Sequence, residues 1–303
     1  MKKIIQTYKA GKQWQHNPPG LGDFIRGTCH LFERLEATGC ELRVDVSQTD
    51  FSTLIEFDPS FFHLGEAHNI ATAQEFFETH EHQEMYAQVD RFLNSQEEEL
   101  YLCTNLGDWN RTSLPAATRA FAKKFYCFNE SVTRSIAEKL TKPEYEVLSI
   151  RAGDQFIGKA DGAVDDALKQ RVFQIIEKKI LPRSTFPIVV MSDSYELKCE
   201  LADRYHCIMF SHVPQHGAYG NALPVAIDMQ LLQHSEFNYH INAWQPWWSG
   251  FSHYTSLIFL IPSINFRSPA FIKEEITRSG NLRVSFEDKL LSKLKRLKDG
   301  FSL

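Results

Sequence analysis

Arg151 stands at the end of an apolar stretch, residues 146–151, that has the pattern of a buried β-strand. A guanidinium in such a position is costly to bury unless it binds an anion, and its planar set of N–H donors matches the oxygens of a phosphate group. Asp154 follows three residues later, and we expect it either to hold the guanidinium or to bind the ligand itself. An ion pair that joins the strand end to its loop is an equally good interpretation of the pattern.

Gly20, Gly22 and Asp23 precede the first helical pattern of the chain, and Arg26 lies one turn inside it. Glycines let a ligand approach the backbone closely, and the partial positive charge of a helix N-terminus attracts anions. The spacing does not complete the Gly-x-Gly-x-x-Gly fingerprint of dinucleotide-binding proteins, and no Gly-Lys-Ser/Thr of a P-loop follows. The segment therefore indicates either a binding loop or a simple turn with an aspartate near a helix start.

Ser192, Asp193 and Ser194 follow another apolar run, residues 187–191, and precede a helical pattern. Each of these three side chains can cap the helix that follows. The alternative hypothesis is that Ser192 and Asp193 contact a nucleotide base or ribose.

A second serine-containing segment stands at the start of the helical pattern at residues 251–260. Hydroxyl groups and free backbone N–H groups at a helix start suit a diphosphate, whereas a serine just before the helix also suits capping. The residues concerned are Ser249, Gly250, Phe251 and Ser252.

These junctions belong to an alternation of short apolar runs with helical patterns. Strands are expected at residues 3–7, 42–46, 100–103, 146–151, 187–191, 207–210 and 237–241. Helices are expected at residues 21–35, 114–128, 130–140, 167–180, 195–205, 223–233 and 251–260. Such alternation predicts an α/β chain with parallel sheets covered on both faces, and ligands at the carboxyl ends of the strands. Pro143 interrupts the pattern, so we expect two Rossmann-like domains, residues 1–142 and 143–303, that face each other across a cleft.

The composition excludes several classes of protein. A net charge of -5 and a pI near 6.2 argue against a nucleic-acid-binding protein. No apolar run approaches the ~20 residues that cross a bilayer, and polar residues follow the N-terminal Met1-Lys2-Lys3-Ile4-Ile5 where a signal-peptide core would stand. The six cysteines form no Cys-x-x-Cys pair and are interpreted as reduced thiols. We therefore expect a cytoplasmic protein.

Other clusters give weaker hypotheses. The histidines at positions 63, 68, 80 and 82 match no zinc-binding spacing, so no metal site is predicted. The absence of Gly-x-Ser-x-Gly leaves a hydrolase triad without support. Trp244, Trp247 and Trp248 are expected to pack in the core or to form a platform for a sugar ring. The basic segment 289–298 is expected to be a helix that packs back on the N-terminal domain.

Taken in order, the strand-end residues resemble the fucosyltransferase superfamily, which includes α1,2-, α1,6- and protein O-fucosyltransferases with a GT-B fold. The segment 149–154, Ser-Ile-Arg-Ala-Gly-Asp, is similar to the His-x-Arg-Arg-x-Asp motif of that family. Residues 191–193, 228–232 and 249–252 resemble its later elements, and Gly20-Leu21-Gly22-Asp23 resembles its Gly-Leu-Gly-Asn/Asp opening. The resemblance spans most of the second half and a short N-terminal piece. Ser149 and Ala152 depart from it, because they replace the motif histidine and its second arginine.

The resemblance implies an inverting, metal-independent glycosyltransferase without a cofactor, which moves fucose from GDP-fucose onto a hydroxyl of a glycan acceptor. Residues 1–142 would form the acceptor side and residues 143–303 the nucleotide-sugar side. Arg151 would stabilise the departing diphosphate and Asp23 would act as the base, with Asp154 as its rival. The expected donor-binding residues are Gly20, Gly22, Arg26, Asp154, Ser192, Asp193, Ser249, Gly250, Phe251 and Ser252.

Three other hypotheses stay open. The departures at Ser149 and Ala152 fit a GT-B enzyme with another donor, such as GDP-mannose, a UDP-sugar or a dTDP-sugar. They also fit a degenerate member that binds nucleotide or glycan without turnover. An NAD-dependent enzyme is disfavoured by the incomplete glycine fingerprint. The acceptor and its linkage do not follow from the sequence, although a surface polysaccharide is a natural expectation.

Overall fold

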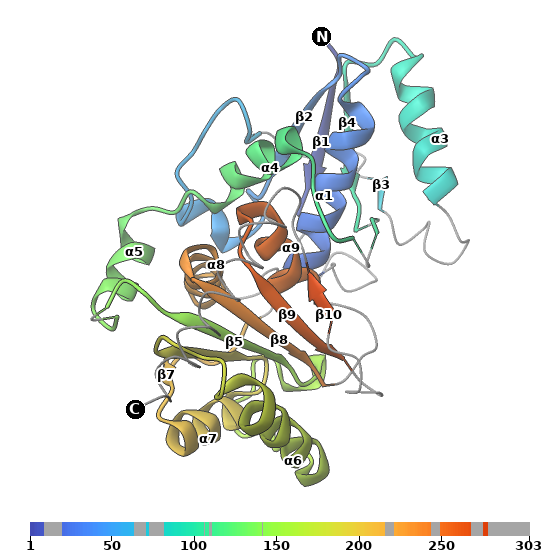
Figure 1. The fold of residues 1–303 in the computed structure, drawn as a ribbon. Coiled ribbons are helices and arrows are strands. Elements are labelled where there is room, and N and C mark those ends of the chain that lie inside the picture. Colours follow the sequence, from blue (N-terminus) through green and yellow to red (C-terminus); the bar gives the residue numbers. More distant parts are fainter. Residues whose placement is uncertain are drawn as a thin grey trace, which may run out of the picture.

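The computed structural model describes residues 1–8, 20–63, 71–72, 82–105, 107–108, 111–140, 142–215, 221–243, 249–267 and 275–277. They form two sheets that divide the chain between Cys103 and Glu146. Figure 1 shows the first sheet with helix α1 beside it and the second sheet below. The expected cluster Trp244, Trp247 and Trp248 and the basic segment 289–298 lie outside the described residues.

The first sheet is parallel throughout, and its order is β2-β1-β4-β3. Its strands are β1 (Lys3–Thr7), β2 (Glu41–Asp45), β3 (Ala71–Thr72) and β4 (Glu99–Cys103). The helices of this half are α1 (Leu21–Leu35), α3 (His82–Leu93), α4 (Ala116–Lys123) and α5 (Glu130–Ala137). Apolar residues recur at helical spacing along α1, and its buried side chains include Phe24, Ile25 and Leu31.

The second sheet has the order β10-β9-β8-β5-β6-β7 and is parallel except for β10, which runs antiparallel to β9. Its strands are β5 (Glu146–Arg151), β6 (Ile188–Ser192), β7 (Ile208–Met209), β8 (Phe237–Asn242), β9 (Ser263–Arg267) and β10 (Glu275–Thr277). Its helices are α6 (Asp166–Ile175), extended by a π-helical turn (Ile176–Ile180), α7 (Tyr195–Tyr205), α8 (Leu223–His234) and α9 (Gly250–Phe259). Short 3-10 turns lie at Asp50–Thr53, Lys124–Tyr126 and Asp154–Phe156.

The order of the second sheet reverses between β5 and β8. From β5 the chain winds outward through β6 and β7, and it then returns to the other side of β5 to form β8 and β9. In open α/β sheets such a reversal leaves a crevice at the carboxyl ends of the two strands, where ligands bind. The last residues of β5 and β8, Arg151 and Asn242, are register partners at this point.

Helix α9 connects the two halves of the molecule. It belongs to the second half, yet it packs against α1 and α4 of the first half as well as against α8 and β8. The Tyr126 hydroxyl and Thr255 Oγ1 on α9 lie 2.8 Å apart in a fully buried hydrogen bond. One apolar core contains buried side chains from both halves, including Phe24 and Leu257. The predicted boundary at 142–143 falls between the two sheets; this core spans it, while two further apolar clusters of the described residues lie one in each half.

Candidate functional site

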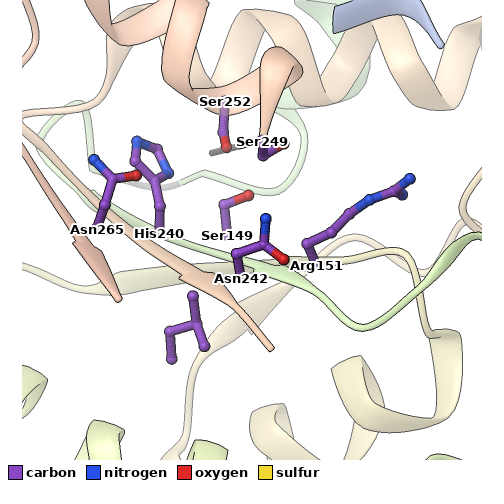
Figure 2. A pocket seen from close by; sticks show the side chains of 8 residues that line it. Ser149, Arg151, His240, Asn242, Ser249, Ser252 and Asn265 are labelled. Carbon is purple, nitrogen blue, oxygen red and sulfur yellow. The ribbon is translucent and has the colours of Figure 1, made fainter. Parts of the chain in front are cut away.

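A narrow, largely enclosed pocket lies between the second sheet and the start of α9 (Figure 2). Ser149 and Arg151 come from β5, which is the central strand at the reversal. Ser249 and Ser252 face them from the first turn of α9. The remaining lining residues belong to β8 and β9 and are His240, Ile241, Asn242 and Asn265. The pocket therefore occupies the place that the sheet order marks for a ligand.

Arg151 extends from one end of this pocket, and Asp193 holds it there. Its NH1 donates to Asp193 Oδ2 at 2.8 Å, and the backbone N–H groups of Ala152 and Gly153 donate to the same carboxylate at 2.6 and 3.0 Å. The Arg151 side chain is 28% exposed, whereas that of Asp193 is 8% exposed. Asp193 thus fixes the loop and the guanidinium together, and the Arg151 side chain stays partly exposed.

The start of α9 lacks the capping bond that its sequence suggested as an alternative. Ser249 is the residue before the helix, but its side chain makes no capping hydrogen bond. Ser252 Oγ is buried and has no hydrogen-bond partner in the described part of the chain, and the Ser252 side chain lines the pocket. N–H groups at a helix start that no side chain caps attract anions, and an unpaired buried hydroxyl calls for a polar partner.

Asp23 lies against the same helix start. A Cβ built on Gly250 would stand 2.9 Å from Asp23 Oδ1, so the carboxylate packs directly against the first residue of α9. Asp23 is 31% exposed and accepts a 2.8 Å hydrogen bond from Arg26 NH1. The structure therefore brings Asp23, from the first half of the chain, to the helix that borders the pocket.

Arg26 is 1% exposed and supports Asp23 from behind. Besides Asp23, its guanidinium donates to the carbonyl oxygen of Asn105 at 2.6 and 3.1 Å. Burial lowers the pKa of Arg26 below its usual range, and the charge of Asp23 offsets part of that effect. This geometry gives Arg26 a structural role, because its buried guanidinium holds Asp23 and the Asn105 carbonyl, and donor contact by Arg26 stays a prediction.

Gly22 and Gly250 allow α1 and α9 to approach each other. A Cβ on Gly22 would lie 2.5 Å from the Cα of Phe251, and a Cβ on Gly250 would lie 2.9 Å from the carbonyl carbon of Gly22. Gly20 is different, because its nearest neighbour would be Asp23 Oδ2 at 3.9 Å. Gly22 and Gly250 therefore position the helix start, and donor contact by any of the three glycines stays a prediction.

The remaining predicted residues have structural partners of their own. Ser194 caps α7 by accepting a hydrogen bond from the Leu197 N–H, and Ser192 Oγ accepts one from the Ser194 N–H. Capping, the alternative to ligand contact, therefore accounts for Ser194. Asp154 begins a 3-10 turn, and its side chain lies outside the described part of the structure. The predicted donor contacts of Ser192, Asp193, Asp154 and Phe251 stay predictions.

His240, Asn242 and Asn265 are pocket residues that the sequence analysis did not select. The first two alternate with Tyr239 and Ile241 along β8, so they share one face of the strand. Ser149 is the register partner of His240, and His240 that of Asn265. The alternation of apolar and polar residues in Phe237–Asn242 is a signal that could have identified His240 and Asn242. Strands of a fully covered parallel sheet are mostly apolar, so polar residues at every second position are unusual there.

Among the residues that the structure describes, no group of three or more His, Cys, Asp or Glu side chains is arranged to hold a metal ion. Within the described elements, no helix combines the length and the apolar character needed to cross a membrane.

The fold is similar to that of solved fucosyltransferases. An α-1,6-fucosyltransferase, NodZ, co-crystallised with GDP, is 15% identical with a TM-score of 0.55, over 92% of this chain and 98% of that one. The structure of NodZ from Bradyrhizobium gives the same identity and TM-score, over 92% and 99% of the two chains. A variant of Arabidopsis thaliana FUT1 in complex with GDP is 12% identical with a TM-score of 0.54, over 89% and 71%. No protein-family model and no curated protein sequence matches the chain. At these identities the comparisons show the fold, and the predicted α/β arrangement of GT-B type is confirmed.

Proposed function

We propose that the protein is an inverting glycosyltransferase that moves a sugar from a nucleoside diphosphate sugar to a hydroxyl group of a glycan, and that its donor is GDP-fucose. The observation that carries this proposal is the placement of Arg151. It stands at the reversal of the second sheet, opposite the uncapped start of α9, and Asp193 holds it with its side chain partly exposed. A guanidinium opposite the uncapped N–H groups of a helix start suits a diphosphate.

The proposed mechanism follows from the charge that develops during transfer. As the bond between the sugar C1 and the diphosphate oxygen breaks, its electron pair moves onto the departing diphosphate. The guanidinium of Arg151 and the N–H groups of the first turn of α9 would stabilise that charge without a metal ion. Removal of one such contact typically costs about 3 kcal/mol of transition-state stabilisation, or roughly a hundredfold in rate.

Asp23 is the proposed base. In an inverting reaction the acceptor oxygen attacks C1 from the face opposite the diphosphate and loses its proton. Asp23 has a partly exposed carboxylate that packs against Gly250, and Arg26 fixes its orientation. The proton would pass from the acceptor hydroxyl to this carboxylate. Asp154 remains the rival candidate for this role.

Two further features support the proposal. The similar structures of NodZ and of the FUT1 variant were each determined with GDP, which makes GDP the first nucleotide to test. The position of the family's second arginine is Ala152, which is 1% exposed and uses its N–H for Asp193. The loop therefore offers Arg151 as its cation, and replacement of Arg151 should be decisive.

Thermal unfolding with a ligand panel tests the proposal. The panel contains GDP, GDP-fucose, GDP-mannose, UDP, UDP-sugars, dTDP and NAD, and a ligand at ~100 times its Kd adds about 2.7 kcal/mol to the free energy of unfolding. We expect GDP and GDP-fucose to raise the Tm, and Arg151→Ala to abolish that shift and sugar transfer. Arg134→Ala is the matched control, because it removes an exposed arginine that pairs with Glu130 on its own helix, away from the pocket.

Other outcomes would favour the rival hypotheses. A shift with another nucleotide sugar alone would keep the glycosyltransferase and change its donor. Tight binding of GDP-fucose without consumption of donor, over a broad set of acceptors, would favour a binding protein without turnover. Sugar transfer that survives in Arg151→Ala would contradict the proposed mechanism.

A further inference from the structure

The inner end of the pocket beneath α9, here called the recess, presents three uncharged hydrogen-bonding side chains: Ser149, His240 and Ser252. His240 is 3% exposed, Ser252 is 1% exposed, and Ser149 reaches the same space from β5. Figure 2 shows the imidazole and the Ser149 hydroxyl on the sheet side and Ser252 on the helix side. The recess adjoins the place proposed for the diphosphate, but Arg151 stands at its end and not inside it.

The hydrogen bonds of Ser256 determine how the imidazole of His240 is protonated. Ser256 Oγ donates its proton to the carbonyl oxygen of Ser252 at 3.0 Å and accepts a hydrogen bond from Asn238 Nδ2 at 2.9 Å. His240 Nε2 lies 3.2 Å from the same oxygen. With the Ser256 proton on the carbonyl oxygen of Ser252, His240 Nε2 donates to Ser256 Oγ. This assignment places the proton of the ring on Nε2.

The other ring nitrogen of His240 is then an acceptor. Burial lowers the pKa of His240 to about 3, so the ring is neutral at physiological pH and Nδ1 carries a lone pair. Nδ1 is buried and has no hydrogen-bond partner among the described residues, and the same holds for Ser252 Oγ. Buried polar atoms are nearly always paired in native proteins, so two unpaired atoms beside one recess indicate a missing polar group.

The chemistry of the recess limits what that group can be. A lone pair on Nδ1 requires a hydrogen-bond donor, and the oxygens of an ionised diphosphate carry no proton to donate. An apolar methyl group would leave Nδ1 unpaired. The recess is also too narrow for a whole hexose ring. A single hydroxyl group, of a ligand or of a water molecule, satisfies all three conditions, because it can donate to His240 Nδ1 and accept from Ser252 Oγ.

We propose that His240 recognises one hydroxyl group of the transferred sugar, which donates a hydrogen bond to Nδ1 while the diphosphate lies at Arg151 and the start of α9. This inference rests on the proposed function and adds a residue that selects the sugar and not the nucleotide. His240 would therefore contribute to the binding of the nucleotide sugar and contribute nothing to the binding of GDP.

The test compares the Kd of GDP with that of GDP-fucose in wild-type protein and in two variants. His240→Leu removes the acceptor and fills the space, and we expect it to weaken GDP-fucose binding about tenfold while GDP binding stays unchanged. His240→Asn places an amide near the position of Nδ1, and we expect it to restore most of the affinity. Binding of GDP-fucose analogues that each lack one hydroxyl gives an independent measurement on the wild type. One analogue should bind to wild type about tenfold more weakly than GDP-fucose does, and should bind to His240→Leu with the same Kd as GDP-fucose.

The outcomes separate this inference from the proposed function. If wild type binds neither GDP nor GDP-fucose, the proposed function fails and the inference fails with it. If wild type binds both ligands but His240→Leu leaves their Kd ratio unchanged, only the inference is overturned, and the recess holds water. An equal loss of both affinities would show that His240 acts through the position of α9, which also overturns it. If every analogue that lacks one hydroxyl binds to wild type with the same Kd as GDP-fucose, direct recognition of a hydroxyl is contradicted. This result does not depend on how well a variant folds.

Discussion

Gly22 of α1 and Phe251 of α9 touch backbone to backbone, so that a Cβ on Gly22 would fall 2.5 Å from the Cα of Phe251. The two residues come from opposite halves of the chain. Their contact sets the helix that borders the pocket against the helix that carries Asp23 and Arg26. The glycine is therefore required by packing between the halves, whatever its part in ligand binding.

Gly22→Ala should destabilise the protein, because the added methyl group meets backbone atoms that cannot move aside independently. Overpacking of this kind costs about 1–3 kcal/mol or more, and we expect a Tm lower by several degrees. Gly20→Ala is the control, because the nearest atom to its Cβ would be 3.9 Å away and its φ of -58° suits alanine. Equal Tm values for the two variants would contradict the role given to the contact.

Asp193→Ala should weaken GDP binding about tenfold or more, although Asp193 is 8% exposed and stands behind Arg151. The change frees the guanidinium and leaves the N–H groups of Ala152 and Gly153 without their acceptor, and an unpaired buried group costs about 1–3 kcal/mol. Calorimetric titration with GDP measures the loss. Asp90→Ala, which removes an exposed partner of Arg34, should leave GDP binding unchanged. Wild-type affinity in Asp193→Ala would show that the loop needs no such support.

Asp23→Asn should reduce kcat by about 10²–10⁴-fold and leave the Kd for GDP within about twofold, because the amide keeps an oxygen for Arg26 but cannot take up a proton. Steady-state transfer assays and calorimetry with GDP separate these two quantities. Asp154→Asn provides the comparison for the rival base. If Asp154→Asn loses kcat and Asp23→Asn does not, the two roles must be exchanged.

His240 should make the protein less stable as the pH falls. Its pKa is about 3 in the folded state and near 6.5 when unfolded, so between these values the unfolded chain binds the extra proton. The contribution of His240 to stability is thus fully present above about pH 6.5 and is lost progressively towards pH 3. At pH 5 the loss amounts to about 2 kcal/mol.

Urea unfolding at pH 7.5 and pH 5 measures this dependence. His240→Leu should reduce the difference between the two free energies of unfolding by about 2 kcal/mol. His206→Asn is the control, because His206 is exposed and its left-handed backbone conformation suits asparagine. If His240→Leu leaves the pH dependence unchanged, the imidazole of the folded wild-type protein is already protonated at pH 5, and its pKa is not lowered.

Local patterns predicted most of the regular structure. The strands at residues 3–7 and 146–151 and the helix at 195–205 were predicted with the bounds that the structure has. Their apolar runs are short and bounded by turn residues, so period and length sufficed. Strand β9 and helix α3 were not predicted, because each has few apolar residues among polar ones: Ser263–Arg267 contributes Ile264 and Phe266 after a proline, and the apolar residues of α3 stand among many polar ones. The expected single helix over 114–128 is α4 followed by a 3-10 turn.

The sequence by itself determined that Arg151 would end a buried strand, since the apolar residues before it and the turn residues after it are neighbours in the chain. Only the tertiary structure brought Asp193, from the adjacent strand end, into an ion pair with it. Whether Asp154, three residues away, also holds the guanidinium or binds the ligand stays a prediction, because its side chain lies outside the described part of the structure. Parallel strands joined by a helix bring their carboxyl ends together whatever their separation along the chain. The same physical reason explains why His240 and Ser252 share a recess with Ser149, and why Asp23 lies against Gly250: such contacts arise from sheet order and helix packing, which no local pattern encodes.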